Sequence, residues 1–264
     1  MKSELAKIGG QPFPSPFQLP LRLKKADFLW VILPALIWVG SIFMRQSVII
    51  PRCTNETQKC SKESLLPVDL LSYGMEDPRA DEYSFFTQNL SGTLAVLLPA
   101  TLSFSRFAMG TLSPAVALST VGVDLVLILQ AATWNGVFLE LTHLVVQRPR
   151  PFVYYDPAQR GADPAHYVSF YSGHTSFAAA MMVAVFLILW MRGAPLLLLL
   201  LSALAAETLI ITTAYFRILA GRHFLTDVIM GALAGTTVAW VVVSRHRSRR
   251  AADSGRGAKL APIP

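Results

Sequence analysis

The chain alternates long apolar segments with short polar ones. The apolar segments cover residues 28–44, 90–104, 116–146, 176–190, 196–216 and 228–243. A helix needs about 20 apolar residues to cross the hydrocarbon core of a bilayer. Five of the segments approach or meet that length, and the short one at 90–104 reaches it by including its small and polar neighbours. The pattern predicts an all-α protein, a bundle of six membrane helices over residues 28–244.

Composition and charge agree with this class and add an orientation. Hydrophobic residues make up 53% of the chain and charged residues only 15%, against about a quarter charged in soluble domains. Basic residues gather in the segments 1–27 and 245–264. Since positive loops stay in the cytoplasm, we expect two cytoplasmic tails and a multi-pass protein of the inner (plasma) membrane. The net charge of +7 then reflects topology and attraction to lipid headgroups, and we expect no nucleic-acid partner.

The segment 46–89 is predicted to be an outer loop. It carries both cysteines of the chain, Cys53 and Cys60. Their spacing permits a disulfide, and an oxidising compartment outside the membrane would allow it to form; two free thiols are the alternative. Apolar residues between 65 and 73 suggest a short helix lying in the membrane interface.

Three polar clusters stand at the ends of apolar segments. They are His143-x6-Arg150-Pro151, Ser172-Gly173-His174 and Arg217-x5-His223-x3-Asp227. With six spans and both termini inside, all three clusters fall at the outer end of the bundle. The topology therefore brings together segments that are far apart in the sequence.

The third cluster contains a histidine and a carboxylate that share a helix face. His223 and Asp227 are four residues apart, so Asp227 is expected to accept a hydrogen bond from one imidazole nitrogen. The other nitrogen is then free to attack phosphorus and form a phosphohistidine. The alternative is a histidine–carboxylate pair that serves stability alone.

The remaining cluster residues suit the binding of a phosphoryl group. Arg150 and Arg217 offer planar donors for its oxygens. Ser172 and Gly173 open a helix, whose free amides make an anion site, and His174 is placed to protonate a leaving oxygen. The other arginines of this region, at 148, 160 and 222, are expected to be interfacial side chains or to steer lipid headgroups.

Together the clusters resemble the signature of the type 2 phosphatidic acid phosphatase (PAP2) superfamily. Its pattern is Lys-x6-Arg-Pro, Pro-Ser-Gly-His and Ser-Arg-x5-His-x3-Asp, and the resemblance runs over about residues 142–227. It implies that His223 is the nucleophile, Asp227 the residue that orients it and His174 the acid. It also implies a phosphate cradle without metal or cofactor, made of Arg150, Ser172, Gly173 and Arg217, with His143 in the position of the lysine.

The sequence departs from that pattern at three positions. His143 replaces the lysine, Tyr171 the proline and Phe216 the serine. Glu140 lies one turn before His143, and we expect it to keep the imidazole charged and to make phosphate binding pH-dependent. The alternative is that His143 fills space and the cationic role is lost.

These patterns predict a membrane phosphatase that hydrolyses a lipid phosphomonoester or diphosphate at the outer (periplasmic) face. Its partners would be the lipid substrate and the surrounding membrane lipids. One alternative is a lipid phosphotransferase with the same phosphohistidine chemistry. Another is a non-catalytic lipid-binding or transport protein, which the acidic residues inside the spans, Asp124 and Glu207, would suit.

Overall fold

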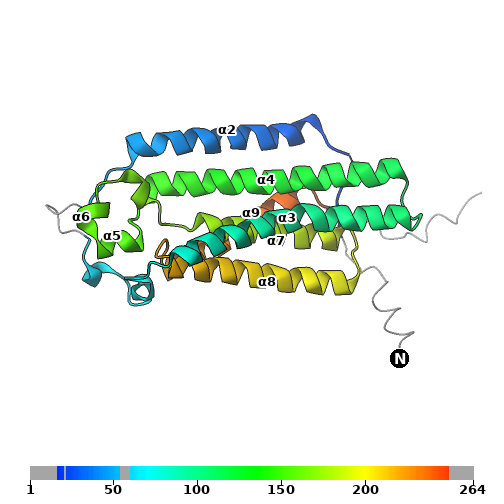
Figure 1. The fold of residues 1–264 in the computed structure, drawn as a ribbon. Coiled ribbons are helices and arrows are strands. Elements are labelled where there is room, and N and C mark those ends of the chain that lie inside the picture. Colours follow the sequence, from blue (N-terminus) through cyan, green and yellow to red (C-terminus); the bar gives the residue numbers. More distant parts are fainter. Residues whose placement is uncertain (1–16, 21, 54–59, 250–264) are drawn as a thin grey trace, which may run out of the picture.

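Six long helices run along a common axis in the computed structural model, which describes residues 17–20, 22–53 and 60–249 (Figure 1). They are α2 (Lys25–Val48), α3 (Pro78–Ala108), α4 (Pro114–Val146), α7 (Gly173–Met191), α8 (Leu196–Leu219) and α9 (Leu225–Arg245). All six are long and apolar enough to cross a membrane. The all-α six-helix fold is therefore confirmed. Most of the two predicted tails lies outside the described residues.

Short elements cover the two ends of the bundle. The helices α5 (Pro151–Tyr155) and α6 (Pro157–Arg160) and the 3-10 turn η3 (Pro164–Tyr167) lie at the end where α4 finishes (Figure 1). At the other end, β1 (Phe17–Gln18) pairs antiparallel with β2 (Ser248–Arg249). This small ladder joins the segment before α2 to the segment after α9.

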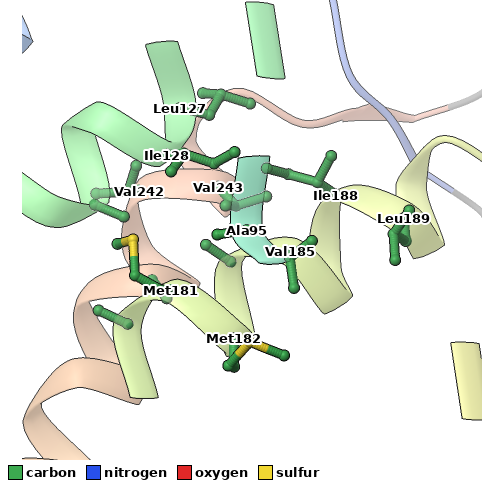
Figure 2. Close-up of a cluster of buried hydrophobic side chains, with 14 of the residues drawn as sticks. Ala95, Leu127, Ile128, Met181, Met182, Val185, Ile188, Leu189, Val242 and Val243 are labelled. Carbon is green, nitrogen blue, oxygen red and sulfur yellow. The ribbon is translucent and has the colours of Figure 1, made fainter. Parts of the chain in front are cut away.

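Helix α7 forms the centre of the bundle and packs against α3, α4, α8 and α9. Its sequence is apolar on all sides, as expected of a buried helix. Val185, Ile188 and Leu189 are fully buried and pack with side chains of α4 and α9 (Figure 2). The start of α7, which carries the Ser-Gly-His cluster, is therefore anchored by the core.

Two glycines let α9 approach α7 closely. A Cβ atom on Gly231 would lie 2.7 Å from the Ser172 carbonyl oxygen, and one on Gly235 would lie 2.0 Å from the Ser176 carbonyl oxygen. Small residues four apart are a common way for membrane helices to come into backbone contact. The Ser172 amide also donates to the Asp227 carbonyl at 3.0 Å. The beginnings of α7 and α9 are thus fixed side by side.

The predicted outer loop is shorter than expected because α3 begins at Pro78 and not near residue 90. Asp77 caps the helix by accepting from the amides of Arg79 and Ala80 at 2.9 and 3.3 Å, and proline suits the first helical position. The early turns bury small and polar residues such as Ser84 and Thr87. A search for apolar runs does not detect a helix of this kind.

The helix predicted over 65–73 is reduced to a single 3-10 turn, η2 (Asp69–Ser72), and a second turn, η1 (Lys62–Ser64), precedes it. The physical reason is Asp69, which is fully buried because Arg148 and Thr226 bind its carboxylate. The segment therefore turns inward at Asp69, whereas the side chains of Leu66, Val68, Leu70 and Leu71 stay exposed.

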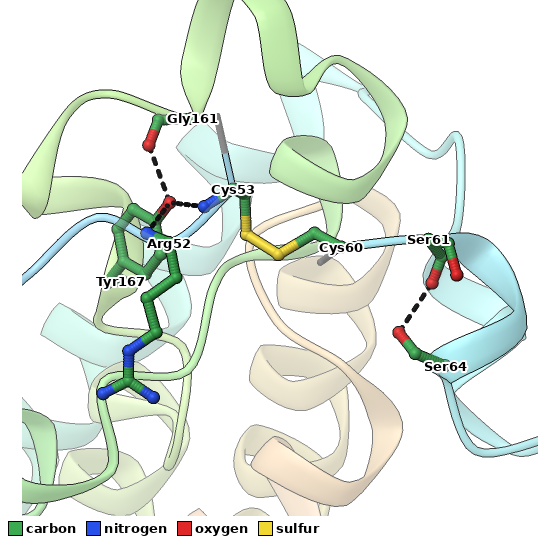
Figure 3. Close-up of a disulfide and its surroundings, with 7 residues drawn as sticks. All are labelled: Arg52, Cys53, Cys60, Ser61, Ser64, Gly161 and Tyr167. Carbon is green, nitrogen blue, oxygen red and sulfur yellow. Dashed lines mark hydrogen bonds between the residues drawn. A yellow bond between two sulfur atoms is a disulfide. The ribbon is translucent and has the colours of Figure 1, made fainter. Parts of the chain in front are cut away.

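The predicted disulfide is present between Cys53 and Cys60, whose Cα atoms are 5.3 Å apart (Figure 3). Beside it, the Tyr167 hydroxyl accepts from the amides of Arg52 and Cys53 and donates to the Gly161 carbonyl at 2.6 Å. These bonds attach the segment after α2 to the loops that follow α4. All of them lie at the same end of the bundle as the polar clusters.

Candidate active site

A cavity of about 310 Å³ lies at this end of the bundle, among α2, α3, α4, α7 and α8 and the segments that follow α4 and α8. All three clusters contribute to its wall, as the topology predicted. The predicted site residues that line it are His143, Arg150, Gly173, His174, Arg217 and His223. Ser172 and Asp227 are fully buried and lie behind the wall.

His223 occupies the turn between α8 and α9, and only 2% of it is exposed. Its Nδ1 lies 2.7 Å from the Ser169 carbonyl oxygen. A carbonyl can only accept a hydrogen bond, so Nδ1 carries the hydrogen and Nε2 keeps its lone pair. Burial, followed by the positive charges of Arg217 and Arg150, holds the pKa of His223 well below its usual range. The result is a neutral imidazole of fixed tautomer at the cavity wall.

Asp227 does not bond directly to His223, in contrast to the sequence prediction. Its Oδ2 is 3.9 Å from His223 Nδ1 and instead accepts from the Ser169 hydroxyl at 2.6 Å and the Phe224 amide at 2.9 Å. The physical reason is that the Ser169 carbonyl already takes the Nδ1 hydrogen. Asp227 therefore orients His223 through Ser169. Ser169 was not predicted, because it lies outside the three clusters and contacts His223 through its backbone carbonyl while its hydroxyl binds Asp227.

Arg148 is not the interfacial side chain that the sequence suggested. Its guanidinium bridges two buried carboxylates, with Nη1 at 2.5 Å from Asp227 Oδ1 and Nη2 at 2.7 Å from Asp69 Oδ2. Nη1 also donates to Thr226 Oγ1 at 2.8 Å, and that hydroxyl donates to Asp69. The bridge ties η2 and the segment after α4 to the first turn of α9.

Arg150 and Arg217, the two arginines of the sequence clusters, bring positive charge to the cavity. Arg217 donates from Nη1 to Asp81 Oδ1 at 2.5 Å and to Ser84 Oγ at 3.1 Å, while its buried Nε has no partner within the described part of the chain. The buried Nε of Arg150 is likewise without one. Buried guanidinium donors normally have acceptors. An anion in the cavity would supply them.

The three residues at the start of α7, Ser172, Gly173 and His174, do not all line the cavity as predicted. The His174 ring lines the cavity, and its buried Nε2 has no hydrogen-bond partner among the residues that the structure describes. The ring meets Phe85 edge-on, with the ring centroids 4.4 Å apart. The Ser172 hydroxyl, however, caps the helix, since it lies 3.5 Å from the Thr175 amide and 3.0 Å from Thr175 Oγ1. Ser172 therefore holds the helix start in shape, and Gly173 is the residue that reaches the cavity.

A family model for the PAP2 superfamily matches residues 122–251 of this chain. The chain belongs to the PAP2 superfamily. The match begins within α4 and includes all three clusters, whereas α2 and α3 precede it. No curated protein and no solved structure matches the chain. PAP2 membership and the six apolar helices make this a membrane protein of the phosphatase type.

The position of the PAP2 lysine is the place where this chain differs most from the pattern. The structure does not support the expected effect of Glu140 on His143. Arg45 binds both oxygens of the Glu140 carboxylate and so neutralises its charge. The Glu140 carboxylate lies 3.8 Å from His143 Nδ1. The other ring nitrogen, Nε2, lies 3.2 Å from the Tyr171 carbonyl oxygen. His143 thus lines the cavity as a buried residue held by a backbone group, and its part in phosphate binding stays a prediction.

Two further arginines at this end of the bundle form ion pairs. Arg222 binds Asp81 at 2.9 Å, and Arg160 binds Glu76 at 2.5 Å. Near the other end of the bundle, Asp124 is buried and binds Arg192 at 2.6 Å. The pairing of Asp124 is a structural link between α4 and the end of α7, far from the cavity.

Proposed function

We propose that this chain is a lipid phosphate phosphatase that hydrolyses a lipid phosphomonoester or diphosphate through a phosphohistidine. The observation that carries the proposal is the neutral His223 imidazole, which faces the same cavity as Arg150, Arg217 and His174. A neutral, oriented histidine is a competent nucleophile. The two guanidinium groups supply the charge that a phosphoryl transition state requires.

The reaction would proceed in two steps. His223 Nε2 forms a bond to phosphorus while the bond from phosphorus to the lipid oxygen breaks, and His174 gives that oxygen a proton. His174 then takes a proton from water, whose oxygen attacks phosphorus and breaks the P–N bond. Inorganic phosphate leaves and His223 is regenerated. Throughout, the Ser169 carbonyl holds Nδ1–H, which stabilises the positive charge on the phosphorylated ring.

We place the reaction at the outer (periplasmic) face. The basic tails support this orientation through the positive-inside rule. The Cys53–Cys60 disulfide is an independent support, because it lies at the same end of the bundle as the cavity and disulfides persist in oxidising compartments. Both observations favour the same side.

The lining of the cavity favours a substrate with an apolar chain. Besides its charged residues, the cavity is lined by Trp38, Ala132, Gly136 and Phe177. These residues belong to membrane-spanning helices, so a chain attached to the bound phosphate would meet apolar side chains. A phosphate ester of a lipid fits this arrangement better than one of a water-soluble alcohol.

Phosphate release by the purified protein tests the proposal. We expect inorganic phosphate from at least one member of a panel of lipid monophosphates and diphosphates in mixed micelles. Vanadate should inhibit because it mimics five-coordinate phosphorus, and a chelator should have no effect. Transfer of label to an acceptor lipid without phosphate release would indicate a phosphotransferase, and neither release nor transfer would contradict an enzymatic role.

The low pKa of His223 predicts the acid side of the pH profile. A lowered pKa means that the ring stays deprotonated below its ordinary value of about 6.5. We therefore expect kcat/KM, which reports the free enzyme, to show no loss near that pH caused by His223. The second ionisation of a phosphate ester also occurs near pH 6. Its effect on the profile is distinguished from that of His223 by comparing a phosphate substrate with the more acidic phosphorothioate, because only a limb caused by the substrate moves with the substrate pKa. An acid limb that stays near pH 6.5 for both substrates would contradict the prediction.

A further inference from the structure

Arg45 lies near the end of α2, in the part of the chain that precedes the PAP2 match. Its side chain lines the same cavity as Arg150 and Arg217. No sequence cluster pointed to it, because it is nearly a hundred residues from the first of them. The cavity wall therefore contains a third guanidinium, contributed by a separate helix.

The pairing of Arg45 leaves one edge of its guanidinium free. Nε donates to Glu140 Oε2 at 2.7 Å and Nη2 donates to Glu140 Oε1. Nη1 has no hydrogen-bond partner among residues 17–20, 22–53 and 60–249. The Arg45 side chain is 26% exposed, whereas Glu140 is 1% exposed. A guanidinium is a rigid fork with five donors, so the buried carboxylate fixes its plane and the free edge remains available.

We propose that Arg45 is a phosphate-binding residue of this enzyme and that Glu140 positions it. This inference rests on the proposed function. Arg45 would supply the permanent cation that an imidazole at position 143 does not, since the carboxylate beside His143, Glu140, is already paired with Arg45. Phosphate binding would then connect α2, which packs mainly on α4, to the residues of the PAP2-matched segment.

The competing explanation is that the Arg45–Glu140 pair only holds α2 against α4. The two explanations differ in what happens when each partner is removed. Arg45→Met removes the guanidinium, whereas Glu140→Gln weakens the pair and keeps the guanidinium in the cavity. A purely structural pair predicts similar losses for both variants. A phosphate-binding role predicts that anion affinity falls much further in Arg45→Met.

The experiment measures vanadate and inorganic phosphate affinity in the full-length protein, by inhibition of phosphate release and by thermal shift. We expect Arg45→Met to weaken both by about tenfold or more, the effect of losing a charge-assisted hydrogen bond. Glu140→Gln should lose clearly less. Arg52→Met is the matched charge control, because Arg52 is at the same end of the bundle but does not line the cavity; it should change affinity by less than about twofold.

A second-site variant keeps the test decisive if Arg45→Met lowers stability. In Arg45→Met/His143→Lys, a new cation enters the cavity wall from α4, and we expect it to restore part of the anion affinity. Equal losses in Arg45→Met and Glu140→Gln, without rescue by His143→Lys, would overturn the inference. Wild-type protein that binds vanadate but releases no phosphate from any lipid would instead contradict the proposed function. In that case the thermal-shift measurement of anion affinity would still test the role of Arg45.

Discussion

Replacing His223 with glutamine should abolish phosphate release, with a loss of about 10⁴-fold or more in kcat, as for the loss of other covalent nucleophiles. The glutamine amide can still donate to the Ser169 carbonyl, which accepts from His223 Nδ1 at 2.7 Å. The substitution therefore preserves the local hydrogen bond and removes only the nitrogen that would attack phosphorus. This makes the loss attributable to chemistry.

Two measurements check the result. The first is phosphate release from the best lipid substrate. The second is acid-labile, base-stable label on the protein after rapid denaturation of turnover mixtures with radioactive substrate. The control is His246→Gln, because His246 bonds to Gln130 near the other end of the bundle and should leave both readouts unchanged. Label that persists in His223→Gln would assign the phosphoenzyme to another residue.

The sequence predicted the six helices and the convergence of the three clusters for a simple reason. Hydropathy and spacing are local patterns that show where each span begins and ends. Because every span must cross the bilayer, residues at alternate span ends lie at the same face of the membrane. His143, Arg150, His174, Arg217 and His223 reach one cavity for this reason. The start of α3 was missed because its first turns are polar and their burial depends on neighbouring helices.

The errors within the site have a shared cause. The pairs Arg148–Asp69 and Arg45–Glu140 join residues that are 79 and 95 positions apart, and no spacing rule connects them. The i,i+4 rule placed Asp227 beside His223 correctly, but it could not foresee that a carbonyl would take the Nδ1 hydrogen. Backbone groups carry no sequence signature. The residues that meet at the cavity were thus largely predictable, and the contacts that position them were not.

Replacing Arg148 with methionine should have the second large effect, and it should reduce stability as well as activity. Asp69 and Asp227 are both fully buried, and Arg148 neutralises both at 2.7 and 2.5 Å. Removing one member of a buried ion pair costs about 3–5 kcal/mol, because it leaves a buried charge without compensation. Asp227 would also lose part of the bonding that holds Ser169, and through it His223.

The surface pair Arg160–Glu76 provides the matched control. Its side chains are 31% and 50% exposed, and exposed pairs contribute only about 0–1 kcal/mol. Arg160→Met should therefore leave the thermal midpoint and kcat nearly unchanged, whereas Arg148→Met should lower both. Adding Asp69→Asn to Arg148→Met removes one stranded charge, so the double variant should be more stable than the sum of the single effects. The double variant should not regain kcat, because Asp227 would still lack its guanidinium partner. If the Arg148→Met protein were as stable and active as the Arg160→Met protein, the bridge would not position the site.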